Sequence, residues 1–146
     1  MSPYKRPESV LVVVHTRGGE VLLLERVRPR GFWQSVTGSL EWGEAAADAA
    51  ARELREETGL VARRALVDLR RGERFPIVPP WRARYGPGVR FNTEHWFAVE
   101  LPGRRMVRLS RQEHRQCRWL PAAAAARRAS SWTNRKAIRA ICGARR

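Results

Sequence analysis

Hydrophobic residues in the first third of the chain cluster in short, largely β-branched runs. Residues 9–16 are mostly apolar, and residues 21–27 form a second such run after the turn sequence Arg-Gly-Gly-Glu at 17–20. Two runs around a glycine turn are typical of a β-hairpin, and a strand without polar alternation is typical of the centre of a sheet. A loop at 28–31 and a short strand at 32–37 are expected next. The chain therefore begins with three predicted strands, the first of them central.

A helical period of hydrophobic positions is clearest over residues 44–58. Gly43 precedes this run and Gly59 follows it, and glycine is the favoured residue just past a helix end. One face carries small side chains that allow close approach to a sheet: Ala47, Ala50, Ala51 and Leu54. The pattern predicts a helix packed closely on the sheet.

Further strands and helices are predicted in the second half of the chain. Strand patterns recur at three places: residues 61–69, 92–101 and 117–120. Residues 70–89 are rich in proline, glycine and aromatic side chains, and we expect them to form a long functional loop or an irregular hairpin. Pro121 opens an alanine-rich helix, and Ser131 is placed to cap a last helix through Cys142. Intermixed strands and helices predict one α/β domain, residues 1–146, with a sheet between helices.

Three carboxylates fall on one face of the helix at 44–58. Glu53, Glu56 and Glu57 stand at i, i+3 and i+4, within about 6 Å of helix rise at about 1.5 Å per residue. Like charges this close repel each other, and a hard divalent cation with oxygen ligands is the simplest group to place among them. Magnesium held there would act as a Lewis acid and lower the pKa of a coordinated water. We predict all three glutamates as metal ligands and catalytic residues.

A longer pattern surrounds these carboxylates. Residues 38–60 read G-x5-E-x7-R-E-L-R-E-E-T-G-L, and they resemble the Nudix box at every position. The resemblance implies a Nudix-type α/β/α sandwich with a mixed β-sheet and a pyrophosphohydrolase that uses Mg²⁺, with Mn²⁺ as the alternative. It also implies that Arg52 orients the neighbouring Glu53 and that Glu44 pairs within the loop–helix unit. Gly38 is expected to offer its carbonyl to the metal.

A fourth carboxylate from outside the box often completes the metal site of this family. Three candidates lie downstream: Glu94, Glu100 and Glu113. Glu100 is expected on the surface at a strand end, whereas Glu113 lies in a polar loop before the last strand, and we predict Glu113 as the ligand. We expect the adjacent His114 to be a solvated loop residue, with a role as base as the alternative. Which glutamate acts as base and which as ligand stays open.

Segments outside the box carry a narrower resemblance. In chain order they are YKRP at 4–7, FWQSVTGS at 32–39, RYGPGV at 84–89, NTEHWF at 92–97, WLPAAA at 119–124 and SWTNR at 131–135. Together they are similar to the bacterial dihydroneopterin triphosphate pyrophosphatases of folate biosynthesis, from about residue 4 to residue 141. The resemblance implies that a small-molecule triphosphate, dihydroneopterin triphosphate, is converted to its monophosphate and pyrophosphate.

Several residue types suit a triphosphate carried on a flat heterocycle. Lys5 and Arg26 are predicted to bind phosphate, Arg26 in bidentate fashion, and Thr37 is placed to offer a hydroxyl. Ser131 resembles a substrate contact of the family, with helix capping as its alternative role. Four aromatic residues are candidates for stacking on the ring, with core packing as the alternative: Trp33, Phe75, Trp81 and Tyr85. Of these, Phe75 is the predicted substrate contact.

Net charge narrows the choice of partner. The chain has a formal net charge of +15, almost all from arginine, which favours anionic partners. It contains no aromatic RNA-binding motif and no basic stripe, so nucleic acid is an unlikely partner. The main alternative function is a housecleaning Nudix hydrolase of nucleoside or deoxynucleoside triphosphates. A weaker one is an RNA 5′-end pyrophosphohydrolase or RNA-binding protein.

Cysteine content and hydropathy bear on location. The two cysteines, Cys117 and Cys142, are too few for a disulfide framework or a zinc site and predict reduced thiols in a cytoplasmic protein. The apolar run at 10–14 is far too short to span a membrane. Nothing in the sequence defines an oligomeric state.

Overall fold

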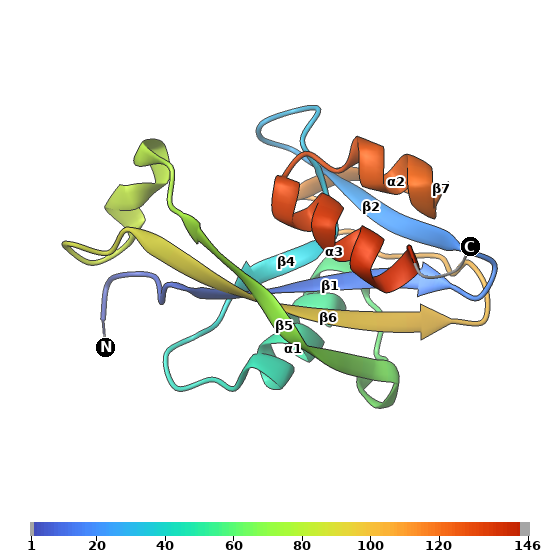
Figure 1. Cartoon of the computed structure of the whole chain (residues 1–146), viewed down its shortest axis with the longest axis horizontal. Helices are drawn as coiled ribbons and strands as arrows, with labels where there is room; N and C mark the ends of the chain where they lie inside the picture. Colours follow the sequence, from blue (N-terminus) through green and yellow to red (C-terminus); the bar gives the residue numbers. More distant parts are fainter. Residues whose placement is uncertain (1, 144–146) are drawn as a thin grey trace.

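Strands and helices are intermixed along the chain in the computed structural model, which describes residues 2–143 (Figure 1). Met1 and residues 144–146 of the predicted domain 1–146 lie outside the described residues. The strands are β1 (Glu8–Thr16), β2 (Glu20–Arg26), β3 (Trp33–Gln34), β4 (Val36–Ser39), β5 (Leu66–Pro76), β6 (Phe91–Leu101) and β7 (His114–Pro121). The helices are α1 (Ala46–Thr58), α2 (Ala122–Arg128) and α3 (Trp132–Cys142), with short 3₁₀ turns at Arg63–Ala65 and Pro79–Arg84.

The strands form one mixed sheet in the order β3-β2-β1-β6-β5, with β4 beside β1 and β7 beside β2. β1 and β6 run parallel, and the other pairs are antiparallel. The predicted hairpin of β1 and β2 is confirmed, with His15 opposite Val21 next to its turn. Farther from the turn, β4 pairs with β1 and β3 pairs with β2. The two hairpin strands therefore diverge, and β3 and β4 fill the space between them.

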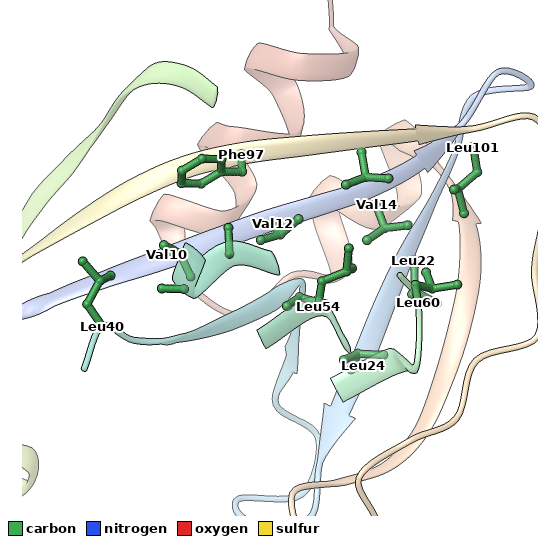
Figure 2. Packing of buried hydrophobic residues seen from close by; sticks show 14 residues of the cluster. Val10, Val12, Val14, Leu22, Leu24, Leu40, Leu54, Leu60, Phe97 and Leu101 are labelled. Carbon is green, nitrogen blue, oxygen red and sulfur yellow. The ribbon is translucent and has the colours of Figure 1, made fainter. Parts of the chain in front are cut away.

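Both faces of β1 are buried, because alternate residues face different helices. One core cluster lies against α1 and includes Val10, Val12, Val14, Leu54 and Phe97 (Figure 2). The other lies against α2 and α3 and includes Leu11, Val13, Ala125, Ala137 and Ile138. Helices thus cover both faces of the sheet (Figure 1), as predicted for an α/β/α sandwich with a mixed sheet.

Two predicted segments differ from the structure. Residues 32–37 form two strands, because the chain passes at Ser35 from pairing with β2 to pairing with β1. The predicted strand 61–69 lies instead at Leu66–Pro76, where its second half pairs with β6 after a register shift between Asp68 and Gly72, so the irregular hairpin is the alternative that holds for the start of 70–89. β5 is an edge strand whose side chains are mostly exposed or half-buried, so it lacks the apolar alternation that indicates a strand.

The helix α1 begins at Ala46 rather than at residue 44, and it ends where predicted. Gly59 adopts a left-handed conformation with φ of 75°, and its N–H donates to the Arg55 carbonyl. The buried face includes Ala49, Ala50 and Leu54, whereas Ala47 is exposed and Ala51 is half-buried. The small-residue face was therefore partly wrong, because alanines occupy both sides of the first turns. Within residues 2–143, no helix combines the length and the apolar character needed to cross a membrane.

Candidate active site

Gly38 allows β4 to approach α1 closely. A Cβ atom on this residue would lie 2.2 Å from Cδ of Glu53 and 2.3 and 2.6 Å from its carboxylate oxygens. Gly38 is paired with Val10 of the central strand, so its backbone is held in place. The glycine of the motif thus brings the backbone of β4 against the Glu53 carboxylate.

The Arg52 guanidinium joins the glycine loop to α1. Its Nε and Nη2 atoms donate to the two carboxylate oxygens of Glu44, each at 2.8 Å, in a bidentate pair. Its Nη1 donates to Oε1 of Glu53 at 2.7 Å, and Nη2 also donates to the Ser39 carbonyl at 3.2 Å. The hydrogen bonds from Arg52 hold the pKa of Glu44 below its usual value. The geometry is the one implied for Arg52 and Glu44: the arginine fixes the orientation of the Glu53 carboxylate.

Glu57 is buried, with 1% of its surface exposed, and its Oε1 has no hydrogen-bond partner among the described residues. Burial raises the pKa of Glu57 well above its usual value, and the neighbouring carboxylates of Glu53 and Glu113 raise it further. The backbone N–H of Thr37 acts in the opposite direction. A buried carboxylate with an unpartnered oxygen is costly, so a positive ligand would complete its surroundings.

Glu113 lies close enough to the box carboxylates to respond to their charge. Burial raises the pKa of Glu113, and the charges of Glu53 and Glu56 raise it further. Glu100 is exposed at the end of β6, as predicted. The structure therefore brings the predicted fourth carboxylate to the cluster.

His114 is buried rather than solvated, so that prediction was wrong. It is 2% exposed because β7 begins at this residue, earlier than the pattern indicated, and the ring faces inward. Its Nε2 lies 3.1 Å from Nε2 of Gln34 and 3.9 Å from Oε1 of Glu57. Burial, aided by the charge of Arg26, lowers the pKa of His114 to about 4. The ring is therefore neutral at neutral pH.

The donor set of the cluster suits a hard divalent cation. Carboxylate and carbonyl oxygens are the ligands Mg²⁺ prefers, and a cation relieves the repulsion that raises the pKa of both Glu57 and Glu113. No three His, Cys, Asp or Glu side chains in the described part of the chain form a ready-made metal-binding group, and Arg52 holds the Glu53 carboxylate instead. Mg²⁺ usually keeps several waters and binds few carboxylates. The residues therefore suit Mg²⁺ because their donor atoms are oxygens and Oε1 of Glu57 has no partner among the described residues, although they do not form a complete set of protein ligands.

A cavity of about 270 Å³ adjoins this cluster, near the lower end of the size range of ligand sites, roughly 300 Å³. Its apolar lining is Leu11, Pro29, Phe32, Phe75, Trp81 and Trp132. Its polar lining is Arg26, Gln34, Thr37, Glu94, Ser131, Thr133 and Asn134. Aromatic walls with a few polar groups suit a small, flat heterocycle.

Three of the lining residues connect the cavity to the carboxylates. Thr37 lines the cavity with its backbone N–H directed to Glu57. Gln34 contacts His114, which lies beside Glu57. The charge of Arg26 acts on Glu113 and lowers its pKa. The cavity and the cluster are therefore two parts of one site.

The predicted phosphate-binding residues meet beside the cluster. Desolvation lowers the pKa of Lys5, as do the charges of Arg84 and Arg26, whereas Glu53 raises it. The Lys5 ammonium lies 5.9 Å from the centre of the Tyr85 ring. These basic groups, brought from separate parts of the chain, form a positive region suited to an anion.

The other predicted substrate contacts also lie at the cavity. Phe75 and Ser131 line it, and Ser131 also caps α3 by accepting from the Asn134 N–H at 3.1 Å. Thr37 Oγ1 donates to the Val10 carbonyl at 2.9 Å, so its hydroxyl can only accept from a ligand. Trp33, by contrast, is a core residue with 5% of its surface exposed.

Sequence reasoning missed the polar side of the cavity. Glu94, considered above only as a metal ligand, is 6% exposed and lines the cavity. Asn134 accepts from the Ser35 N–H at 2.7 Å and donates to the Ser35 hydroxyl at 2.9 Å, which joins α3 to the junction of β3 and β4. A carboxylate within the apolar strand β6 was the signal that points to Glu94.

The molecule has the features of a Nudix-type hydrolase. It is an α/β/α sandwich with a mixed sheet, Gly38 of β4 lies against the Glu53 carboxylate of α1, and a cavity adjoins them. The chain belongs to the Nudix family, since the family model described as NUDIX domain matches residues 5–141.

Within this family, the chain is similar to dihydroneopterin triphosphate diphosphatases. The one from Escherichia coli (strain K12) is 47% identical over 139 residues, which cover 92% of this chain and 91% of that protein. The one from Haemophilus influenzae is 38% identical over 143 residues, covering 95% of this chain and 89% of that protein. The structure of the E. coli dihydroneopterin triphosphate pyrophosphohydrolase superposes with a TM-score of 0.89 and 43% identity, covering 98% of this chain and 99% of that one. Both the Nudix resemblance and the narrower resemblance are thereby confirmed.

Proposed function

We propose that the protein hydrolyses dihydroneopterin triphosphate to dihydroneopterin monophosphate and pyrophosphate, with Mg²⁺, or Mn²⁺ in its place, as cofactor. The observation that carries this proposal is the continuity of an aromatic-lined cavity with a carboxylate cluster through Arg26, Gln34 and Thr37. A flat ring fits the aromatic-lined cavity, and phosphates with a cation fit the carboxylate cluster. The similar E. coli and H. influenzae proteins are diphosphatases of this compound, which supports the same substrate here.

The reaction breaks the anhydride bond between the α- and β-phosphates. A water oxygen forms a new bond to phosphorus, the bridging oxygen remains with one product, and the water proton passes to a base. The bound cation supplies charge neutralisation on the phosphates and acidifies a coordinated water. The protein must hold that cation, accept the proton and orient the triphosphate.

We assign the cation to the oxygens of five residues: Gly38, Glu53, Glu56, Glu57 and Glu113. Arg52 acts on Glu53 by fixing its carboxylate, through the bond at 2.7 Å. Glu57 is our choice of base, because it is buried within the cluster and its Oε1 has no hydrogen-bond partner among the described residues, which leaves that oxygen available to accept a proton. The neutral His114 beside it keeps Glu57 away from solvent without adding charge.

Substrate binding falls to the residues between the cluster and the cavity. Lys5 and Arg26 bind the phosphates, where charge-assisted hydrogen bonds are strongest. Phe75 contacts the face of the pterin, and Ser131 contacts the substrate from the start of α3. We place the reaction in the cytoplasm, because the chain has only two cysteines, too few for the disulfide framework typical of secreted domains.

The decisive experiment is a substrate panel with the purified protein and Mg²⁺. It contains dihydroneopterin triphosphate, the common nucleoside triphosphates, 8-oxo-dGTP and 5′-triphosphate RNA. We expect the highest kcat/KM for the pterin, with pyrophosphate and the monophosphate as products. A higher kcat/KM for a nucleoside triphosphate would replace the proposal by the housecleaning alternative, and a preference for RNA would replace it by the RNA-end alternative.

A pair of variants tests the assignment of Glu57 as the base. Glu57→Gln removes the buried charge and should lower turnover by at least about a hundredfold, as expected when a general base is lost. Glu100→Gln is the matched control, because Glu100 is an exposed glutamate on β6 away from the cluster. Full activity in a folded Glu57→Gln protein would overturn the assignment.

A further inference from the structure

Glu94 is a buried carboxylate that belongs to the cavity and not to the carboxylate cluster. It lies in β6, is 6% exposed, and lines the cavity. Burial is the main cause that raises the pKa of Glu94, and the charge of Glu73 raises it further. Because Glu94 lies among the cavity residues, we assign it to the cavity and not to the cation placed on α1.

The protein satisfies only part of the hydrogen-bonding capacity of Glu94. Trp96 Nε1 donates to its Oε1 at 3.0 Å, and a hydrogen bond with Thr133 also favours the charged form. An ionised carboxylate has about four acceptor positions, so positions remain for a group in the cavity. Glu73 adds repulsion rather than a counter-ion. A bound ligand with N–H donors would complete the surroundings of this buried charge.

The remaining lining defines what kind of ligand can present those donors. Phe75, Trp81 and Trp132 offer apolar surface for a flat ring, while Arg26 and Thr37 lead from the cavity to the phosphate-binding region. A ring held between aromatic side chains meets a carboxylate through its edge, so the donors must lie in the ring plane.

We propose that Glu94 is a specificity-determining residue that accepts two adjacent in-plane N–H groups from the ring edge of the substrate. The 2-amino-4-oxo-pyrimidine edge, which pterins and guanine share, carries such a pair as its ring N–H and its amino group. Adenine presents an acceptor beside its amino group, and lumazine presents a carbonyl in place of the 2-amino group. This inference rests on the proposed function, which gives the pterin as the natural ligand. It adds that the Glu94 carboxylate is the group that selects the pterin ring.

The test is equilibrium binding of free pterin and free lumazine, measured by fluorescence in the presence of EDTA so that no hydrolysis intervenes. Wild-type protein should bind pterin more tightly, by roughly ten- to a hundredfold, as expected for one hydrogen bond to a charged group. Glu94→Gln should lose this preference, because the N–H₂ group of the glutamine amide would face an N–H donor of the pterin edge. It should also raise KM for dihydroneopterin triphosphate more than it lowers kcat.

Glu73→Gln is the matched control, since it removes the neighbouring charge while leaving the Glu94 carboxylate in place, and it should keep the pterin preference. Equal or unmeasurable binding of pterin and lumazine by the wild type would overturn the inference, even if Glu94→Gln failed to fold. Hydrolysis of dihydroneopterin triphosphate with an unchanged pterin preference in Glu94→Gln would refute the inference but not the proposed function. A Glu94-dependent pterin preference without hydrolysis of that substrate would refute the proposed function alone.

Discussion

Gly38→Ala tests how tightly β4 and α1 are coupled at the candidate active site. The new Cβ atom would lie 2.2 Å from Cδ of Glu53, whereas ordinary contact begins at 3.4 Å, so the carboxylate must move by at least about 1.2 Å. The atoms in the way are the end of a flexible side chain, and the glycine backbone is not in the left-handed region. Alanine also restricts the unfolded chain, which contributes about 0.4–1 kcal/mol of stability. The strand should therefore tolerate the change.

The expected result is a folded protein with impaired catalysis. Misplacing a catalytic group by about 1 Å can lower the rate by about a hundredfold, which corresponds to about 2.7 kcal/mol at about 1.36 kcal/mol per tenfold. We expect kcat/KM for pyrophosphate release to fall by about this factor, while Tm stays within about 4 °C of wild type. Gly18→Ala is the matched control, because its Cβ would meet only Thr16 Oγ1 at 3.7 Å.

Either of two outcomes would refute this reasoning. Wild-type kcat/KM in Gly38→Ala would show that the position of the Glu53 carboxylate does not matter for turnover. A fall in Tm of more than about 10 °C, several times the shift that 1 kcal/mol produces in a domain of this size, would show that the backbone and not the side chain resists the methyl group.

Three further predictions concern packing, the arginine and pH. Leu54→Ala removes a fully buried side chain beneath α1 and should lower the free energy of unfolding in urea by about 2–5 kcal/mol; a loss under about 1 kcal/mol would contradict the packing. Arg52→Lys cannot form the bidentate pair with Glu44 and should lower kcat/KM by at least about tenfold, whereas unchanged kinetics would argue against an orienting role. Hydrogen bonds from Gln116 and Gly31 lower the pKa of Glu25 to about 2, so its stabilising effect is present above pH 4.5 and is lost as the pH falls toward 2. Glu25→Gln should therefore melt below wild type at pH 7, and the difference should shrink in acid; a difference independent of pH would refute this.

The helix that carries the chemistry was predictable because its determinants are local. The carboxylate spacing, Gly43 and Gly59 all act within a few residues of one another, and the structure ends α1 where Gly59 predicts. The surroundings of Glu57 are different, since they include the backbone N–H of Thr37 in β4 and the charge of Glu113 from a distant loop. Periodicity alone cannot show which of three adjacent glutamates is enclosed.

Three differences between prediction and structure share one physical origin, because each concerns residues whose surroundings come from elsewhere in the chain. Residues 70–76 lack a buried face, so their strand is defined only by hydrogen bonds to β6. The sequence around His114 is typical of a loop, but His114 is the first residue of β7 and its ring contacts Gln34. Glu94 is visible in the sequence as a carboxylate within an apolar strand, but its place in the cavity depends on Thr133 at the start of α3.

The alternation along β1 separates two tasks within one strand. Val10 and Val12 support the helix that carries the carboxylates, whereas Leu11 contributes to the cavity. A substitution at position 11 can thus alter which ring system is bound while leaving the carboxylate helix unchanged. A substitution at Val10 or Val12 can alter the support of that helix while leaving the cavity unchanged. During divergence of such a scaffold, choice of substrate and cleavage of the anhydride can therefore be inherited and modified independently.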